Sequence, residues 1–244
     1  MSAAVYTRFE LRRTFRNRRF FLLAFGFPLV LYFLIAAPNR HVDSLAGTGI
    51  SAPLYYMTGL AAFGTMSAML STGARIAGER AVGWNRQLRI TPLSTRAYFR
   101  AKVLTAYIVA ASSLFLLYVS GTILGVRLSA HEWLEMTWLI LVGLIPFAVM
   151  GILFGHIVSA DSVGPLMGGS TALFAFLGGT WFPITNSVLR HIAELLPSYW
   201  LVQASHVALG GDVWGVKGWI VIAVWTVGLA LLAARAWRRD TGRA

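Results

Sequence analysis

The residues that could carry acid–base, metal or nucleotide chemistry are few in this sequence, and they stand apart from one another. Glu79 and Asp161 lie just beyond the ends of apolar segments, whose interiors contain no Asp, Glu, Lys or Arg. The five His residues include no H-E-x-x-H pair, the chain has no Cys, and it has neither a G-x-S-x-G nor a G-x-x-x-x-G-K-[ST] motif. We therefore expect no catalytic centre, no metal site and no means of hydrolysing ATP within this chain.

One hydrophilic segment, residues 79–94, carries residue types that suit binding to another protein. Gly83 permits a sharp break after the preceding apolar segment. Residues 81–90 can then form a short helix, which Pro92 cannot continue. Ser94 can cap the helix that follows. We expect a short surface helix that displays basic and polar side chains, although the same composition also suits a basic loop that lies on lipid headgroups.

A second segment, residues 183–200, is amphipathic. Its apolar residues follow helical spacing, and its charged residues fall on the opposite face between Pro183 and Pro197. The apolar positions are Val188, Leu189, Ile192, Leu195 and Leu196. This pattern predicts a helix that dips into the outer leaflet of a membrane. It could shape an exit gate or serve only as an interfacial spacer.

Apolar helices must position these two segments. The chain is 57% hydrophobic and only 12% charged, which is too apolar for an ordinary soluble domain. Six runs approach the roughly 20 residues that cross a bilayer, and none shows the alternation of a membrane barrel strand. Three Gly-x-x-x-Gly pairs, beginning at Gly121, Gly151 and Gly164, permit close helix packing. The six runs are residues 20–37, 53–75, 103–126, 136–158, 166–182 and 217–234.

The distribution of charge predicts the orientation in the membrane. All but four of the 21 Lys and Arg residues fall in segments that share one side if the N-terminus is inside. The positive-inside rule therefore predicts cytoplasmic termini. The formal charge of +12 is then explained by attraction to anionic lipid headgroups rather than by a nucleic-acid partner. Residues 1–19 are expected to form a helix on the membrane surface, and a solvated basic tail is the alternative.

Together the two hydrophilic segments resemble the ABC-2 family of membrane permeases. The family's loop after its second helix reads Glu-Arg, Gly, Leu and Thr-Pro-Leu-Ser, and its fifth helix has a Gly-rich end followed by Phe-Pro and a later Pro. Six spans, an interfacial N-terminal helix and inside termini extend the resemblance over essentially the whole chain, although the connection at residues 38–52 is shorter than in many relatives. The matching residues here are Glu79-Arg80, Gly83, Leu88, Thr91-Pro92-Leu93-Ser94, Gly178-Gly179, Phe182-Pro183 and Pro197.

The resemblance implies an all-α integral membrane protein of six spans that works with other subunits. Two copies of a separate ATP-binding cassette subunit would bind ATP and Mg and dock on a coupling helix, so this chain would bind no cofactor and would not be an enzyme. A second copy of the chain, or a homologous permease, would pair with it. Nearby Arg residues could hold Glu79 where the second span meets the coupling helix. The docking residues implied are Glu79, Arg80, Gly83, Trp84, Arg86, Leu88, Arg89, Thr91 and Pro92.

The implied transport path would run beside the second and fifth spans. Its candidate apolar contacts are Phe174, Phe176, Trp181, Phe182 and Pro183, for which core packing is the alternative. Weakly polar spans rich in aromatic residues favour an amphipathic drug-like or lipid-like cargo, exported from the cytoplasm or the inner leaflet of a bacterial cell membrane. The alternatives are export of a polysaccharide, a membrane protein of immunity or structural type that transports nothing, and, least favoured, an intramembrane enzyme.

Overall fold

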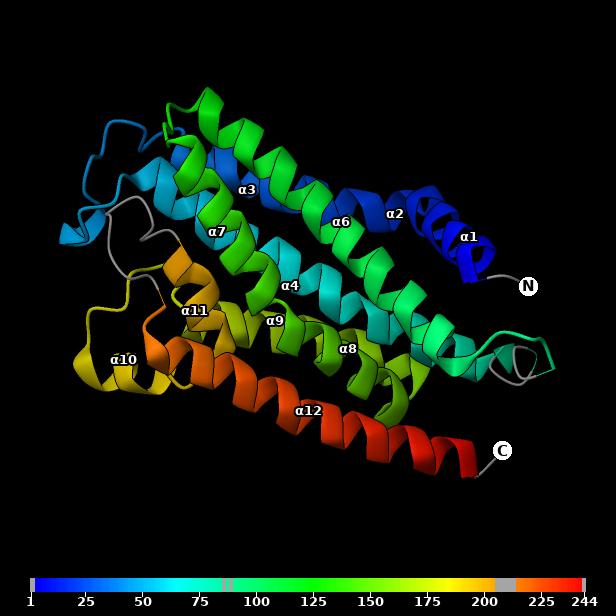
Figure 1. The fold of residues 1–244 in the computed structure, drawn as a ribbon. Helices are drawn as coiled ribbons and strands as arrows, with labels where there is room; N and C mark the ends of the chain where they lie inside the picture. Colours follow the sequence, from blue (N-terminus) through cyan, green and yellow to red (C-terminus); the bar gives the residue numbers. More distant parts are fainter. Residues whose placement is uncertain (1–2, 85–86, 88–89, 205–213, 243–244) are drawn as a thin grey trace.

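The computed structural model describes residues 3–84, 87, 90–204 and 214–242, which fold into a bundle of helices with no strand among them (Figure 1). The predicted all-helical class is confirmed. The helices are α1 (Ala3–Arg16), α2 (Arg18–Phe21), the π-helical turn η1 (Leu22–Gly26), α3 (Phe27–Ala36), the 3₁₀ turn η2 (Leu45–Gly47), α4 (Ala52–Ala81), α6 (Thr95–Ile123), α7 (Ala130–Gly143), α8 (Ile145–Ile157), α9 (Ala160–Leu177), α10 (Ser187–Ala193), α11 (Pro197–Gln203) and α12 (Val216–Gly242).

Three helical stretches of the described chain are long and apolar enough to cross a membrane. They are α6, the pair α7–α8 over residues 130–157, and residues 216–239 of α12. Residues 24–36 form a shorter apolar helix. The other two predicted runs correspond to α4 and α9, which are richer in Gly, Ser and Thr and are therefore less apolar. The count of six spans stays a prediction.

Helix α4 forms the centre of the bundle. It packs against α3, α6, α8 and α9, and most of its residues are buried (Figure 1). Small residues allow this close packing: a Cβ added at Gly151 of α8 would lie 2.6 Å from the carbonyl oxygen of Met69 in α4. The predicted role of the pair at Gly151 and Gly155 is thus confirmed for this contact. By contrast, Gly164 and Gly168 have no neighbour within 4 Å of an added Cβ.

Several boundaries differ from the predicted runs for local reasons. Helix α9 ends at Leu177 rather than near residue 182, because Gly179 has a φ of +80° and turns the chain away. The stretch over residues 188–198 is two helices rather than one. Leu196 is extended, as expected for the residue before a proline, and Pro197 starts α11.

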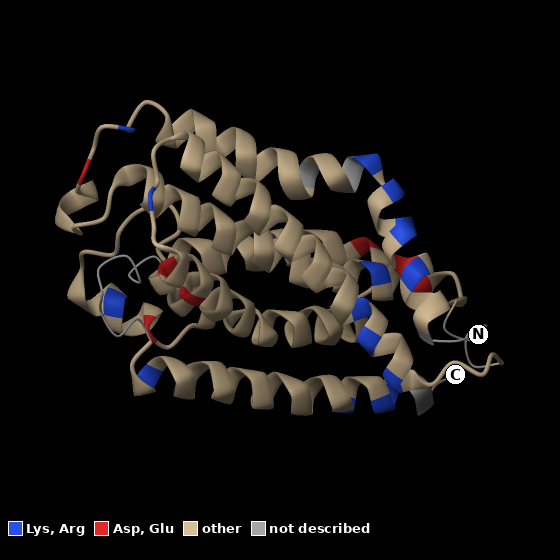
Figure 2. Ribbon diagram, turned by 45° about the horizontal axis from the view of Figure 1, so that its top comes forward, with Lys and Arg blue, Asp and Glu red and all other residues tan. Residues whose placement is uncertain are grey.

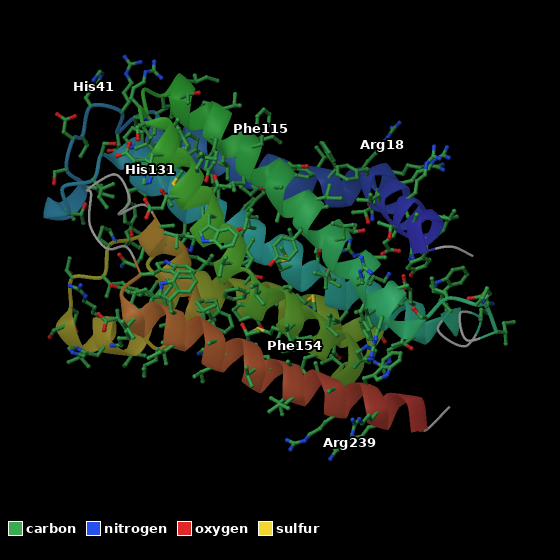
Figure 3. All side chains as sticks on the ribbon, viewed as in Figure 1. Arg18, His41, Phe115, His131, Phe154 and Arg239 are labelled. Atoms are coloured by element: carbon green, nitrogen blue, oxygen red, sulfur yellow. The ribbon has the colours of Figure 1, made fainter. Side chains whose placement is uncertain are left out.

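The two ends of the bundle differ in charge. Basic residues gather at the end that carries both termini, which we call the basic end (Figure 2). Arg18 and Arg239 lie at this end, whereas His41 and His131 lie at the opposite end (Figure 3). This separation is the charge asymmetry that the sequence predicts. The side of the membrane that each end faces stays a prediction.

The opposite end is held together by hydrogen bonds from aromatic side chains. The Tyr55 hydroxyl of α4 donates to the carbonyl of Gly179, which fixes the turn after α9. The indole N–H of Trp200 donates to the Glu194 carbonyl at 3.0 Å, and that of Trp225 donates to the Leu195 carbonyl at 2.8 Å. These bonds attach the end of α10 to α11 and α12.

Candidate functional site

A group of charges with a buried centre lies at the basic end, where α1, α4 and α6 meet; Glu10, Glu79 and Lys102 are buried, whereas Arg13 is about half exposed. The group comprises Glu10, Arg13, Arg75, Glu79 and Lys102, which we call the ion network. The Lys102 side chain is 0% exposed, and its Nζ donates to Glu10 Oε1 at 2.6 Å and to Glu79 Oε1 at 2.5 Å. A buried ammonium is stable only when it is paired with carboxylates in this way. Glu10 and Glu79 therefore both help to keep Lys102 charged in the interior.

Helical spacing brings the members of the network to one place. On α1, Tyr6, Glu10 and Thr14 recur every four residues, and all three are buried. On α6, Tyr98 and Lys102 have the same spacing and are also buried. Each helix therefore presents one polar stripe to the others at the level of the network.

Glu79 has the largest set of partners in the network. Its Oε1 accepts from Arg13 Nη1 at 2.8 Å as well as from Lys102, and its Oε2 accepts from the Tyr98 hydroxyl at 2.8 Å. The expectation that Arg residues near Glu79 hold this joint is met by Arg13, which belongs to the N-terminal helix rather than to the loop. Because both carboxylate oxygens are bonded, the end of α4 is fixed to α1 and α6 together.

Arg75 completes the network one helical turn before Glu79. Its guanidinium donates to the hydroxyls of Thr14 and Thr72 at 3.0 Å each, which ties α4 to α1 a second time. Burial raises the pKa of the Tyr6 phenol, and the nearby carboxylates of Glu79 and Glu10 raise it further. Tyr6 therefore stays neutral at physiological pH and adds no charge to the network.

The ion network flanks the hydrophilic segment 79–94 on both sides. Helix α4 ends at Ala81, and Gly83, with a φ of +70°, makes the predicted break. At the far side the Ser94 hydroxyl accepts from the Ala97 N–H at 3.2 Å and caps α6, as predicted. Glu79 is thus the first residue of the segment, and Lys102 lies about two helical turns after its end. Both ends of the loop are attached to α1 through the same ions.

Among the docking candidates that the structure describes, Arg80 and Trp84 have different surroundings. The Arg80 guanidinium donates to the carbonyls of Gly155 and Val158 at 3.0 and 3.3 Å, which places it against the end of α8. The Trp84 indole N–H lies near the Tyr6 hydroxyl and lowers its pKa, against the larger rise caused by burial. The two groups do not meet the distance and angle of a hydrogen bond.

The structure also describes Gln87, Thr91 and Pro92 further along the loop. The Gln87 N–H bonds to the Gly83 carbonyl at 3.4 Å, as in a helical turn. Thr91 and Pro92 lie in the turn before Ser94, with Thr91 half-buried and Pro92 exposed. Arg86, Leu88 and Arg89 lie outside the described residues.

The five candidate path residues are also dispersed. Phe174 packs edge-on against Phe147 and Trp225 in the core, with ring centroids 5.4 and 5.9 Å apart. Core packing, the alternative reading, therefore accounts for Phe174. Phe176 lies on the opposite, exposed face of α9, and Phe182 is exposed beyond the helix.

The last two candidates lie near the Gly179 turn at the opposite end. Trp181 contacts Phe63 of α4, with ring centroids 5.5 Å apart. Pro183 lines a cavity of about 230 Å³ beside Tyr55 and Gly179. The structure thus brings Trp181 and Pro183 to the N-terminal half of α4, but it does not align all five residues along one route.

Sequence reasoning named only Glu79 of the ion network; it missed the other four members, and also Tyr98, which bonds to Glu79. The missed members are Glu10, Arg13, Arg75 and Lys102. A signal for the first was available, because Glu10 is the only acidic residue before Asp43 and sits among six Arg residues in the first 19 positions. A carboxylate in such a place is more plausibly paired than solvated. Lys102 gave no comparable signal, since it reads as an ordinary basic residue before an apolar run.

Comparisons with known proteins place this geometry in context. A family model described as an ABC-2 family transporter protein matches residues 35–235. A protein of Bacillus subtilis (strain 168) named "Putative transport permease YvfS" is 26% identical over 194 residues, which cover 78% of each chain. The matched range contains Glu79 and Lys102 together with the loop between them, whereas α1 precedes it.

Proposed function

The chain belongs to the ABC-2 family of transporter proteins as a permease, and from that membership we propose that it is the membrane subunit of an ATP-driven exporter. Two copies of a separate ATP-binding cassette subunit would bind ATP and Mg and supply the energy. This chain would form the path through the bilayer of a bacterial cell membrane, with both termini in the cytoplasm.

The observation that carries the proposal is the attachment of the loop at residues 79–94. An energy-supplying subunit can move a membrane helix only if the segment it touches is rigidly joined to that helix. Glu79 and Lys102 join the two ends of the loop to each other and to Glu10. A push on the loop would therefore move α1, α4 and α6 as one body rather than bending the loop alone.

Exposed apolar side chains on the loop suit a protein partner. Val82 and Ile90 are 76% and 88% exposed, which is unusual for aliphatic residues in a basic segment. Such residues anchor contacts when a partner covers them. Closure of two ATP-bound subunits against two such loops would turn a paired permease from inward-facing to outward-facing.

We propose an amphipathic drug-like or lipid-like cargo over a polysaccharide. An apolar cavity of about 530 Å³ lies between the N-terminal helices and α6, and its lining includes Phe15, Phe21, Phe25 and Phe115. Figure 3 labels Phe115 on α6. A sugar polymer would require polar groups beside the aromatic rings, whereas the described lining is aromatic and aliphatic apart from Ser112. The cavity favours a substrate that enters from lipid.

Co-purification tests the docking. The tagged chain is co-expressed with an ATP-binding cassette subunit, and the amount of that subunit retained and its ATPase activity are measured. Val82→Asp combined with Ile90→Asp should remove most of the bound subunit, because two carboxylates would be buried in an apolar contact. Val188→Asp, at a residue 68% exposed at the opposite end, is the matched control and should retain it.

Two results would contradict the proposal. Equal loss of the subunit from the loop variant and the control would show that docking does not use the loop. Failure of any ATP-binding cassette subunit to associate with the unaltered chain would instead favour a membrane protein that transports nothing.

A further inference from the structure

A cavity lies between the ends of α8 and α12 at the basic end, and Arg80, from the start of the loop, borders it. Its volume is about 670 Å³, and it is the most basic of the described cavities. Arg239, near the end of α12, lies beside this region (Figure 3). The cavity lining comprises Arg80, Leu153, His156, Ile157, Leu232, Arg235, Ala236 and Arg239.

Charge is the first property that limits the occupant. Three Arg residues and one His line the cavity, and none of its described lining residues is acidic. Leu232, Arg235 and Arg239 share one face of α12 because they are spaced by three and four residues. Arg235 and Arg239 are exposed and make no ion pair within the described part of the chain. An anion fits this cavity and a cation does not.

The second property is the apolar part of the lining. Leu153 belongs to a small core cluster to which α4, α8, α9 and α12 contribute, while Ile157 and Leu232 are about half exposed beside the Arg residues. On α8, His156 packs edge-on against Trp237 of α12, with ring centroids 5.1 Å apart, which closes the inner wall. The cavity therefore has a cationic rim and an apolar wall next to each other.

We propose that this cavity binds an anionic phospholipid, with the lipid phosphate at Arg235 and Arg239 and an acyl chain along Ile157 and Leu232. Guanidinium groups bind phosphate oxygens through paired hydrogen bonds. Basic pockets between membrane helices on the cytoplasmic side suit such headgroups. A free phosphate would use the rim and leave the apolar wall without a partner. The proposal does not depend on an ATP-binding subunit.

Lipid titration of the purified full-length chain in neutral detergent tests this proposal. Phosphatidylglycerol, phosphatidylcholine and inorganic phosphate are added separately, and the midpoint of thermal unfolding and the lipids retained in native mass spectrometry are recorded. Phosphatidylglycerol should raise the midpoint and remain bound. Phosphatidylcholine and inorganic phosphate should do so only at concentrations at least about tenfold higher, because each supplies one part of the recognition.

A double variant locates the effect. Arg235→Gln with Arg239→Gln should weaken phosphatidylglycerol binding about tenfold or more, since each surface cation contributes appreciably to attraction of anionic lipid. Arg12→Gln with Arg16→Gln removes the same charge from exposed positions on α1 and is the matched control. It should bind phosphatidylglycerol as the unaltered chain does.

The outcomes separate the possible ligands. Equal binding by both double variants would overturn the site, and a full response to inorganic phosphate would overturn the lipid as its occupant. Equal responses to phosphatidylglycerol and phosphatidylcholine would overturn the requirement for an anionic headgroup.

Discussion

At the level of single residues, Lys102 has an environment that is costly for a charged side chain, because it is fully buried. Its ammonium is fully buried between the carboxylates of Glu10 and Glu79, with the Tyr98 ring centroid 5.3 Å from Nζ. A buried ion pair adds little net stability compared with an apolar replacement of the whole group. Loss of one buried member is costly because the buried charges that remain would be neither paired nor hydrated. The network thus specifies how α1, α4 and α6 fit together.

Lys102→Met tests this position. It should lower the free energy of unfolding by about 3–5 kcal/mol, because two buried carboxylates lose their shared cation. The change is measured by chemical unfolding in detergent. Lys217→Met, at the chain's other lysine, breaks a half-exposed pair with Glu194 and should cost about 0–1 kcal/mol.

A second substitution distinguishes charge imbalance from loss of packing. Glu10→Gln added to Lys102→Met removes one of the stranded carboxylates and should restore part of the lost stability. If the double variant is no more stable than Lys102→Met, the account of the ion network is wrong.

The ion pair between Lys217 and Glu194 gives a prediction about the pH dependence of stability. The Lys217 ammonium, bonded to Glu194 at 2.5 Å, lowers the pKa of this carboxyl, and Arg190 lowers it further. Because the folded pKa lies below the unfolded value, the stabilisation is complete above the ordinary pKa of about 4.3 and disappears as the pH falls through the lowered value.

Thermal unfolding of the unaltered chain and of Glu194→Gln measures this effect. The unaltered chain should be the more stable at neutral pH, and the difference should vanish in acid below the lowered pKa. A difference that grows on acidification would contradict the assignment.

At the level of elements, α4 positions the site because its neighbours approach its backbone. The contact between α4 and α8 depends on Gly73, Gly151 and Gly155, where any added Cβ meets a neighbouring helix. This contact continues to the basic end, where α4 presents Glu79 to the ion network. A change in the distance between α4 and α8 should therefore also disturb the loop that follows.

Gly151→Ala tests the close packing. The added methyl group would lie 2.6 Å from the Met69 carbonyl oxygen, so the helices must separate, at a cost of about 1–3 kcal/mol. Gly228→Ala is the matched control, since nothing lies within 4 Å of its added Cβ. It should be neutral or stabilising by up to about 1 kcal/mol. Similar losses from both variants in thermal unfolding would exclude close packing as the cause.

The elements also show which features sequence alone could predict. Local rules were sufficient at Gly83 and Ser94, because a helix break and a cap each depend on one residue and its neighbours. The prediction of a single helix up to Pro197 was wrong, because this proline begins a second helix. The partnership of Lys102 with Glu10 spans 92 positions, and that of Arg13 with Glu79 spans 66. No local pattern encodes such pairs, since each residue alone resembles an ordinary surface charge.

At the level of the whole molecule, charge and packing together give the bundle a direction. Basic residues gather at the end that carries the termini (Figure 2), where the lipid cavity that we propose also lies, and the helices α10 and α11 lie at the other end (Figure 1). The positive-inside rule predicts that the basic end faces the cytoplasm. Energy from an ATP-binding subunit would then enter where the ion network lies and would be carried along α4 and α6.

Cross-linking from a single cysteine tests the central claim most directly, because the natural chain has none. Gln87→Cys places a thiol in the loop, and Ser187→Cys places one at the start of α10, at the opposite end. In membranes that contain the assembled complex, the account predicts a cross-link between residue 87 and the ATP-binding subunit, and none from residue 187. A cross-link from residue 187, or none from residue 87 while the complex remains intact, would contradict it.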